Sequence, residues 1–165
     1  MPVSKMKPSN YEPPARKAVR IRQTVFIPAP PEKVYAAYLD GKKHSAMTGG
    51  QAEFDPHEGG DFTAWDGYIS GTILELEKGK KIVQDWITTE WPEGYPRSVL
   101  TLSFKPKEKG TELEMVQECV PASQAKDYEQ GWHNFYWKPM QKYFSASKKK
   151  APAAGSAAKK TARKK

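Results

Sequence analysis

The chain has 165 residues, a length that suits one domain with a core of its own. Its net charge is +8, and residues 145–165 contain eight Lys or Arg and no acidic residue, so residues 1–144 balance acidic and basic side chains. The basic character therefore belongs to the C-terminal segment, which weakens the case for a folded domain that binds nucleic acid.

Targeting signals and cysteine usage fit a cytoplasmic protein. The sequence has no run of about 18 apolar residues that would predict a membrane span, and its first residues lack the apolar stretch of a secretory signal. Cys119 is the single cysteine, so an intramolecular disulfide is excluded. We therefore expect a cytoplasmic location.

The N-terminal part predicts one strand followed by two short helices. Residues 1–18 hold four prolines and no apolar periodicity, so we expect a flexible lead-in. Residues 19–27 alternate apolar and polar side chains, which is typical of a half-buried strand. Two prolines at 30 and 31 suit the start of a helix that extends to 39, and residues 42–47 predict a second short helix.

The middle of the chain predicts a sheet. Strand-like runs joined by short Gly- and Pro-rich turns succeed one another, which favours an antiparallel meander. These runs occupy residues 51–55, 61–64, 67–77, 81–89, 98–104 and 111–120.

A long aromatic helix is predicted at the C-terminal end, over residues 127–144. At about 100° per residue, one apolar stripe collects Tyr128, Trp132, Phe135, Tyr136, Pro139, Met140 and Tyr143. Pro139 is expected to kink the helix, because it lacks an amide donor. Trp137 lies near the boundary with the polar face, which leaves two interpretations open. It either anchors a partner protein from an exposed position or packs under a neighbouring segment.

This order of elements predicts an α+β fold over residues 19–144, with a curved antiparallel sheet wrapped on the long helix. Residues 145–165 contain only small, Lys or Arg side chains and proline, and are expected to be a disordered basic tail. Eight tail positions predict weak, sequence-independent contact with nucleic acid, although a purely solubilising tail is an equal alternative. They are Lys148, Lys149, Lys150, Lys159, Lys160, Arg163, Lys164 and Lys165.

The sequence shows no catalytic or metal-binding pattern. The three histidines, His44, His57 and His133, lack the spacing of a zinc site, and neither a phosphate-binding loop nor a GxSxG motif occurs. We therefore predict no metal, no cofactor and no enzymatic activity. Hydrolase, cyclase or dehydratase chemistry is the minor alternative.

Several short motifs, taken in order, resemble a known family. They are FTAWDGYISG at 62–71, IVQDW at 82–86, WPEG at 91–94, GTEL at 110–113, VP at 120–121 and QGW at 130–132. The sequence resembles the C-terminal-type domain of the activator of heat-shock-protein-90 ATPase, a family of the START-like, helix-grip (SRPBCC) superfamily. The resemblance covers about residues 19–144 and implies a helix-grip fold whose cavity, between the sheet and the long helix, binds hydrophobic or aromatic small molecules. It also implies a role in the stress response and a heat-shock-protein-90 homologue as partner.

Two functional hypotheses follow. In the first, the domain binds a hydrophobic or aromatic small molecule through eight pocket residues, although core packing is the simpler alternative for each of them. The eight are Trp65, Tyr68, Trp86, Leu102, Met115, Trp132, Tyr136 and Met140. In the second, the domain is a co-chaperone-like interaction module that binds a heat-shock-protein-90 homologue, with Trp137 on its partner surface.

Overall fold

A computed structural model describes residues 18–150, with side chains described to residue 146. Its seven strands form one antiparallel sheet in the order β1-β7-β6-β5-β4-β3-β2. The meander expected from the turn signals is thus confirmed, with the first strand added at the edge beside the last. The strands are β1 (Ala18–Ile27), β2 (Glu53–Phe54), β3 (Asp61–Ala64), β4 (Ile69–Glu77), β5 (Lys81–Thr88), β6 (Ser98–Lys107) and β7 (Gly110–Pro121).

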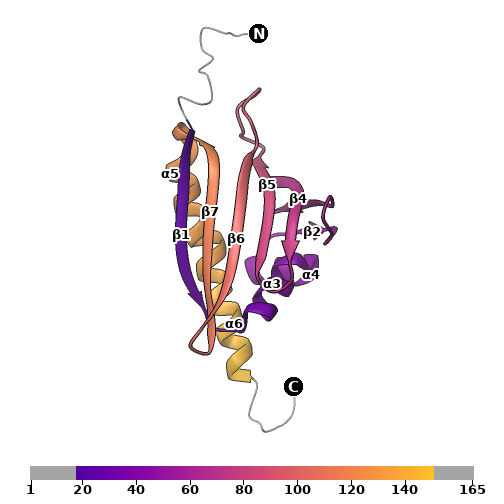
Figure 1. Cartoon of the computed structure of the whole chain (residues 1–165), viewed down its shortest axis with the longest axis vertical. Helices are drawn as coiled ribbons and strands as arrows, with labels where there is room; N and C mark the ends of the chain where they lie inside the picture. The colour runs from indigo at the N-terminus through magenta and orange to yellow at the C-terminus, as the bar shows by residue number, and fades with distance from the viewer. Residues whose placement is uncertain (1–17, 151–165) are drawn as a thin grey trace.

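The helices confirm the α+β, helix-grip prediction. The C-terminal helix is continuous in three parts and runs along one face of the sheet, behind β1, β7 and β6 in the view of Figure 1. Two short helices follow the first strand, and of these α3 contacts β6 and β7 while α4 contacts the C-terminal helix. The helical elements are α3 (Pro31–Leu39), α4 (Gly41–Thr48), α5 (Ala122–Trp132), the π-helical turn η1 (His133–Trp137) and α6 (Lys138–Lys150).

The first strand has the predicted inward face with one exception. Ile21 and Ile27 are buried and Val25 is half-buried, but Val19 is 38% exposed. Val19 lies beside a β-bulge, where the register between β1 and β7 shifts and Cys119 adopts a φ of 66°. The inward face of β1 therefore begins at Ile21.

The turn before Pro139 changes the geometry of the C-terminal helix. The amide of Lys138 donates to the carbonyl of His133, five residues earlier, which is the hydrogen bond of a π turn. Pro139 follows directly and has no amide hydrogen to donate. A kink was expected at Pro139, whereas the irregularity that the structure shows is a wider turn directly before it, which carries Phe135 and Tyr136.

The C-terminal helix extends farther than predicted. Disorder was expected from residue 145, but α6 continues to Lys150, because Ala and Lys favour helix. Lys148, Lys149 and Lys150 occupy its last turn, and their side chains lie outside the described part. The other proposed nucleic-acid contacts also lie outside the described residues, namely Lys159, Lys160, Arg163, Lys164 and Lys165, as do residues 1–17 of the expected lead-in.

Within residues 18–150, no helix is long and apolar enough to cross a membrane. In the same part of the chain, no three His, Cys, Asp or Glu side chains gather closely enough to hold a metal ion.

Candidate functional site

A cavity of about 430 Å³ lies between the first half of the C-terminal helix and the strands β4 and β5. Seven of its ten lining residues are aromatic. The lining consists of Trp65, Tyr68, Ile69, Trp86, Asp127, Tyr128, Gly131, Trp132, Phe135 and Tyr136.

The inner wall of the cavity is a cluster of aromatic rings. Trp86 of β5 meets Tyr128 edge-on at 5.4 Å between ring centroids and faces Trp132 at 5.8 Å. Tyr136 continues the cluster, with its ring 4.9 Å from that of Trp132. Aromatic pairs favour such offset and edge-on arrangements, so the wall is well packed although it borders an open space.

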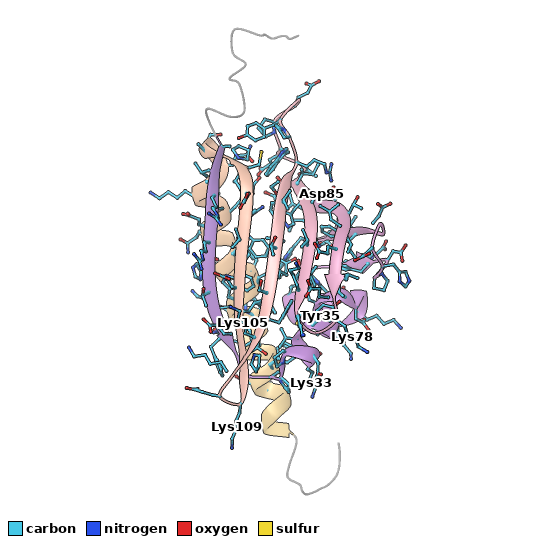
Figure 2. All side chains as sticks on the ribbon, in the orientation of Figure 1. Lys33, Tyr35, Lys78, Asp85, Lys105 and Lys109 are labelled. Carbon is cyan, nitrogen blue, oxygen red and sulfur yellow. The ribbon has the colours of Figure 1, made fainter. Side chains whose placement is uncertain are left out.

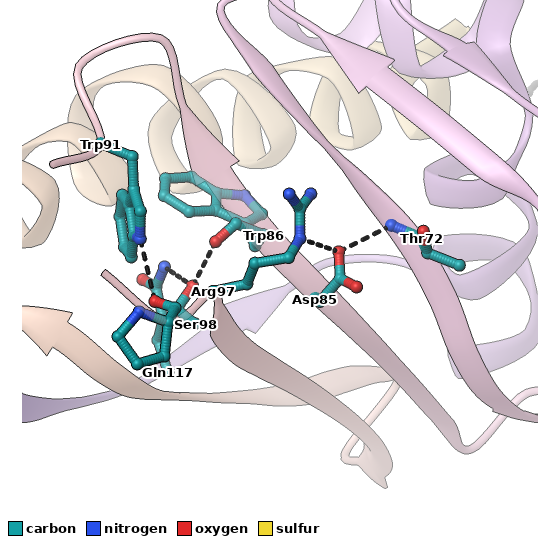
Figure 3. Close-up of polar contacts among 8 residues, drawn as sticks. Thr72, Asp85, Trp86, Trp91, Arg97, Ser98 and Gln117 are labelled. Atoms are coloured by element: carbon teal, nitrogen blue, oxygen red, sulfur yellow. Dashed lines mark hydrogen bonds and ion pairs between the residues drawn. The ribbon is translucent and has the colours of Figure 1, made fainter. Parts of the chain in front are cut away.

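A hydrogen-bonded chain connects the Trp132 ring to the backbone of Trp86. The indole N–H of Trp132 donates to Gln117 Oε1 at 3.0 Å, and Gln117 Nε2 donates to Ser98 Oγ at 3.1 Å. The Ser98 hydroxyl then donates to the backbone carbonyl of Trp86 at 2.6 Å, as Figure 3 shows. Because Gln117 and Ser98 are fully buried, each link satisfies a polar group that would otherwise be unpaired.

The mouth of the cavity is formed by a strained turn. Trp65 and Asp66 join β3 to β4 with φ values of 52° and 60°, which non-glycine residues rarely adopt. The Trp65 ring packs so closely on Gly50 that a Cβ there would lie 2.4 Å from it, so position 50 requires glycine. On the other side Trp65 meets Phe135, which is 53% exposed, at 5.4 Å. The indole N–H of Trp65 is buried without a hydrogen-bond partner in the described part of the chain.

A buried histidine orients Tyr136. His44 lies on α4, whose first turn is capped by the Asp40 carboxylate. Its Nδ1 lies 2.8 Å from the Tyr38 carbonyl oxygen, which can only accept, so Nδ1 carries the proton. Its Nε2, 2.9 Å from the Tyr136 hydroxyl, must then accept from it. Burial lowers the pKa of His44 to about 4, which keeps this arrangement neutral at physiological pH.

The other two tyrosine hydroxyls donate to groups at the rim. The Tyr68 hydroxyl donates to Glu90 Oε1 at 2.8 Å, and the Tyr128 hydroxyl donates to Gln124 Oε1 at 2.5 Å. Burial raises the pKa of both phenols, and the Glu90 carboxylate adds to this effect. Both tyrosines are therefore neutral hydrogen-bonding groups.

The structure places five of the eight predicted pocket residues on the cavity: Trp65, Tyr68, Trp86, Trp132 and Tyr136. It does not bring the other three to the cavity. Leu102, Met115 and Met140 are fully buried in the core between sheet and helix, because their flexible aliphatic chains fill the space available to them.

Five lining residues were not predicted as pocket residues. Tyr128 and Phe135 belong to the aromatic stripe, so the sequence did signal their face. Ile69 follows the Asp66-Gly67 turn, and Gly131 has no side chain to reveal its position. Asp127 does not belong to the predicted apolar stripe, and only the structure shows that it lines the cavity.

Trp137 is not on an exposed partner surface, and that prediction is wrong. It is 2% exposed, stacks on Trp132 with centroids 5.2 Å apart, and donates from its indole N–H to Gln23 Oε1 of β1 at 2.7 Å. The prediction assumed about 100° per residue throughout the helix. The π turn contains an additional residue and so rotates Trp137 back toward the sheet.

Comparison of the sequence with known proteins identifies relatives of this chain. A family model described as "Activator of Hsp90 ATPase homolog 1-like protein" matches residues 28–145. The activator of 90 kDa heat shock protein ATPase homolog 1 of Homo sapiens is 32% identical over 114 residues, 69% of this chain and 33% of its own length. The Mus musculus protein of the same name is 30% identical over 141 residues, 86% of this chain and 40% of its own. The chain thus spans between a third and two fifths of these relatives.

Solved structures agree with the sequence comparison. An HSP90 activator from Plasmodium falciparum superposes with a TM-score of 0.68 at 25% identity, covering 78% of this chain and 96% of the other. Ara h 8.0201 shares the fold with a TM-score of 0.63 at 13% identity, over 78% of this chain and 99% of the other. Together, the seven-stranded sheet gripping a long helix and the family match over residues 28–145 show that the chain belongs to the family of Activator of Hsp90 ATPase homolog 1-like proteins.

Proposed function

We propose that the domain binds an apolar or aromatic small molecule in the cavity between sheet and C-terminal helix, without catalysing its conversion. The observation that carries this proposal is the cavity itself, about 430 Å³ with seven aromatic side chains in its lining. Its volume is within the range of about 300–1,000 Å³ that is typical of small-molecule sites.

Buried hydrogen bonds fix the positions of two rings in the cavity lining. Trp132 is fixed by Gln117, and Tyr136 by His44, so neither ring can turn into the space without breaking a buried hydrogen bond. A preformed site of this kind binds with little loss of side-chain entropy.

A cavity-filling variant tests the proposal. Gly131 lines the cavity, and a Cβ added there would lie 3.7 Å from the Phe135 ring, an ordinary contact. Gly131→Leu should project methyl groups into the cavity and weaken binding of a neutral naphthalene fluorophore at least about tenfold. Gly131→Ala is the matched control and should bind the probe within about twofold of wild type.

The readout is a fluorescence titration of the full chain, with circular dichroism to show that both variants are folded. Equal binding of the probe by the wild type and by folded Gly131→Leu would contradict a site in this cavity. No binding by the wild type would contradict the proposed function.

A second candidate is a co-chaperone-like module that binds a heat-shock-protein-90 homologue. It is supported by the family match and by the names of the human, mouse and Plasmodium relatives. With this candidate function we also propose a role in the stress response and a cytoplasmic location. Calorimetric titration of the full chain with a purified heat-shock-protein-90 homologue tests it, and absence of binding at high micromolar concentrations would remove it.

A further inference from the structure

The charged groups around the cavity are acidic. Among the residues that the structure describes, Asp127 is the one charged residue in the lining, and no Lys, Arg or His belongs to it. Glu90, outside the lining, accepts the hydroxyl of Tyr68, and its charge acts on Tyr128, as does the charge of Asp127. Lys126 precedes Asp127 on α5 and is exposed, but it is not part of the lining. An anion entering this cavity would meet repulsion from Asp127 and no cation among the described lining residues.

Several basic side chains lie outside the cavity lining. Asp85 precedes Trp86 on β5, and Arg97 forms an ion pair with it at 3.0 Å, so the charge of Arg97 is compensated. Figure 2 shows that four lysines lie toward the opposite end of the molecule from Asp85: Lys33, Lys78, Lys105 and Lys109.

The tyrosine hydroxyls of the lining also disfavour an anionic ligand. Tyr136 gives its hydrogen to His44, Tyr128 to Gln124 and Tyr68 to Glu90. The Tyr128 oxygen also lies 2.7 Å from Thr88 Oγ1, and Thr88 must donate to it because Tyr128 gives its own hydrogen to Gln124. None of the three hydroxyls therefore has a hydrogen left to donate to an anionic ligand. The ring faces of the lining carry the negative end of the aromatic quadrupole, which attracts cations.

We infer that the cavity selects an organic cation, a tertiary or quaternary ammonium group attached to an apolar or aromatic body. The rings of Trp86, Trp132 and Tyr136 surround the bound group, and the Asp127 carboxylate at the mouth balances its charge. Aromatic cages recognise quaternary ammonium groups in this way. The inference rests on the proposed function, since it specifies the ligand class of the same cavity.

Three naphthalene ligands that differ in charge test the inference. They are (2-naphthylmethyl)trimethylammonium, its neutral tert-butyl isostere and 2-naphthylacetate, each titrated into the full chain at low ionic strength. We expect the cation to bind at least about tenfold more tightly than the isostere, and the acetate to bind most weakly. Equal or tighter binding of the isostere would overturn the cation preference and leave the proposed function standing. Binding of none of the three would overturn both.

A charge-neutral variant tests the role of the carboxylate. Asp127→Asn should reduce the preference for the cation over the isostere about threefold without changing affinity for the isostere, because Asp127 is exposed and partly screened. Glu129→Gln, an exposed acid on the same helix outside the lining, is the matched control and should leave the ratio unchanged. An unchanged ratio in Asp127→Asn would overturn the assignment of Asp127.

Discussion

The interface between sheet and helix has two regions, one aliphatic and one aromatic, that pack differently. In the first region Leu102, Met115 and Met140 are fully buried and do not line the cavity. In the second, Trp86 and Trp132 border about 430 Å³ of open space. Aliphatic chains adapt to one another and fill gaps, whereas the rings are rigid, and the Trp132 ring is also held by a buried hydrogen bond. The cavity is thus lined by rigid rings, whereas the flexible aliphatic side chains lie in the buried core.

The largest expected effect lies in the aliphatic region. Leu102→Ala should lower the free energy of unfolding by about 2–5 kcal/mol, because the surrounding core cannot close the space left behind. Urea unfolding measures this directly. A loss below about 1 kcal/mol would show that the aliphatic region is as loosely filled as the aromatic one, and the contrast between them would fail.

A pH titration probes the anchor of Tyr136. The pKa of His44 is about 4 in the folded chain, against 6.5 for an exposed histidine, so the unfolded chain binds a proton that the folded chain does not. The contribution of His44 to stability is complete above about pH 6.5 and should fall by about 3 kcal/mol as the pH drops to about 4.

Replacing the histidine should remove this dependence. His44→Gln is expected to flatten the stability profile between pH 6.5 and 4, whereas His133→Gln, at an exposed position of the C-terminal helix, should preserve it. Denaturant unfolding at several pH values measures both. A profile unchanged by His44→Gln would contradict a buried, neutral His44.

An intermediate effect is expected for the anchor of Trp132. Trp132→Phe keeps an aromatic ring but leaves Gln117 Oε1 buried without a donor, which should cost about 1–3 kcal/mol of stability. Adding Gln117→Met should recover part of this loss, because the unpaired oxygen is then removed. Chemical unfolding of the single and double variants measures their free energies of unfolding. If Gln117→Met lowered the stability of Trp132→Phe further, the hydrogen bond would not be what holds the ring.

The smallest effect is expected at Gly131 in the aromatic region. Gly131→Ala should raise stability by up to about 1 kcal/mol, since alanine favours helix and its Cβ would make an ordinary contact with Phe135. Thermal unfolding measures the change. Destabilisation would mean that position 131 tolerates no side chain and that the cavity wall is tighter than described.

The fold was largely predictable because its signals are local. Alternation in residues 98–104 and 111–120, turn residues between the strands and helical spacing after 127 are each read from neighbouring residues. The strand ends moved by only a few residues, and the final helix ran on to Lys150.

The site was predictable only in part, because its decisive features are not local. Periodicity shows that Trp132 and Met140 share a face, but not that one borders open space and the other fills it. The bond between His44 and Tyr136 joins residues 92 positions apart. Trp137 was misplaced because a π turn interrupts the regular spacing on which the prediction depended.

The tryptophan indole signals provide the most direct test of the central claim that the aromatic cavity is an open binding site. Trp65, Trp86 and Trp132 line the cavity, whereas Trp91 and Trp137 do not. In ¹H–¹⁵N spectra of the full chain titrated with the neutral naphthalene probe, the three lining indoles should shift and saturate together, with Trp137 shifting least. The account would be contradicted if the lining indoles showed no saturable shift. It would also be contradicted if the Trp137 signal shifted as much as that of Trp86.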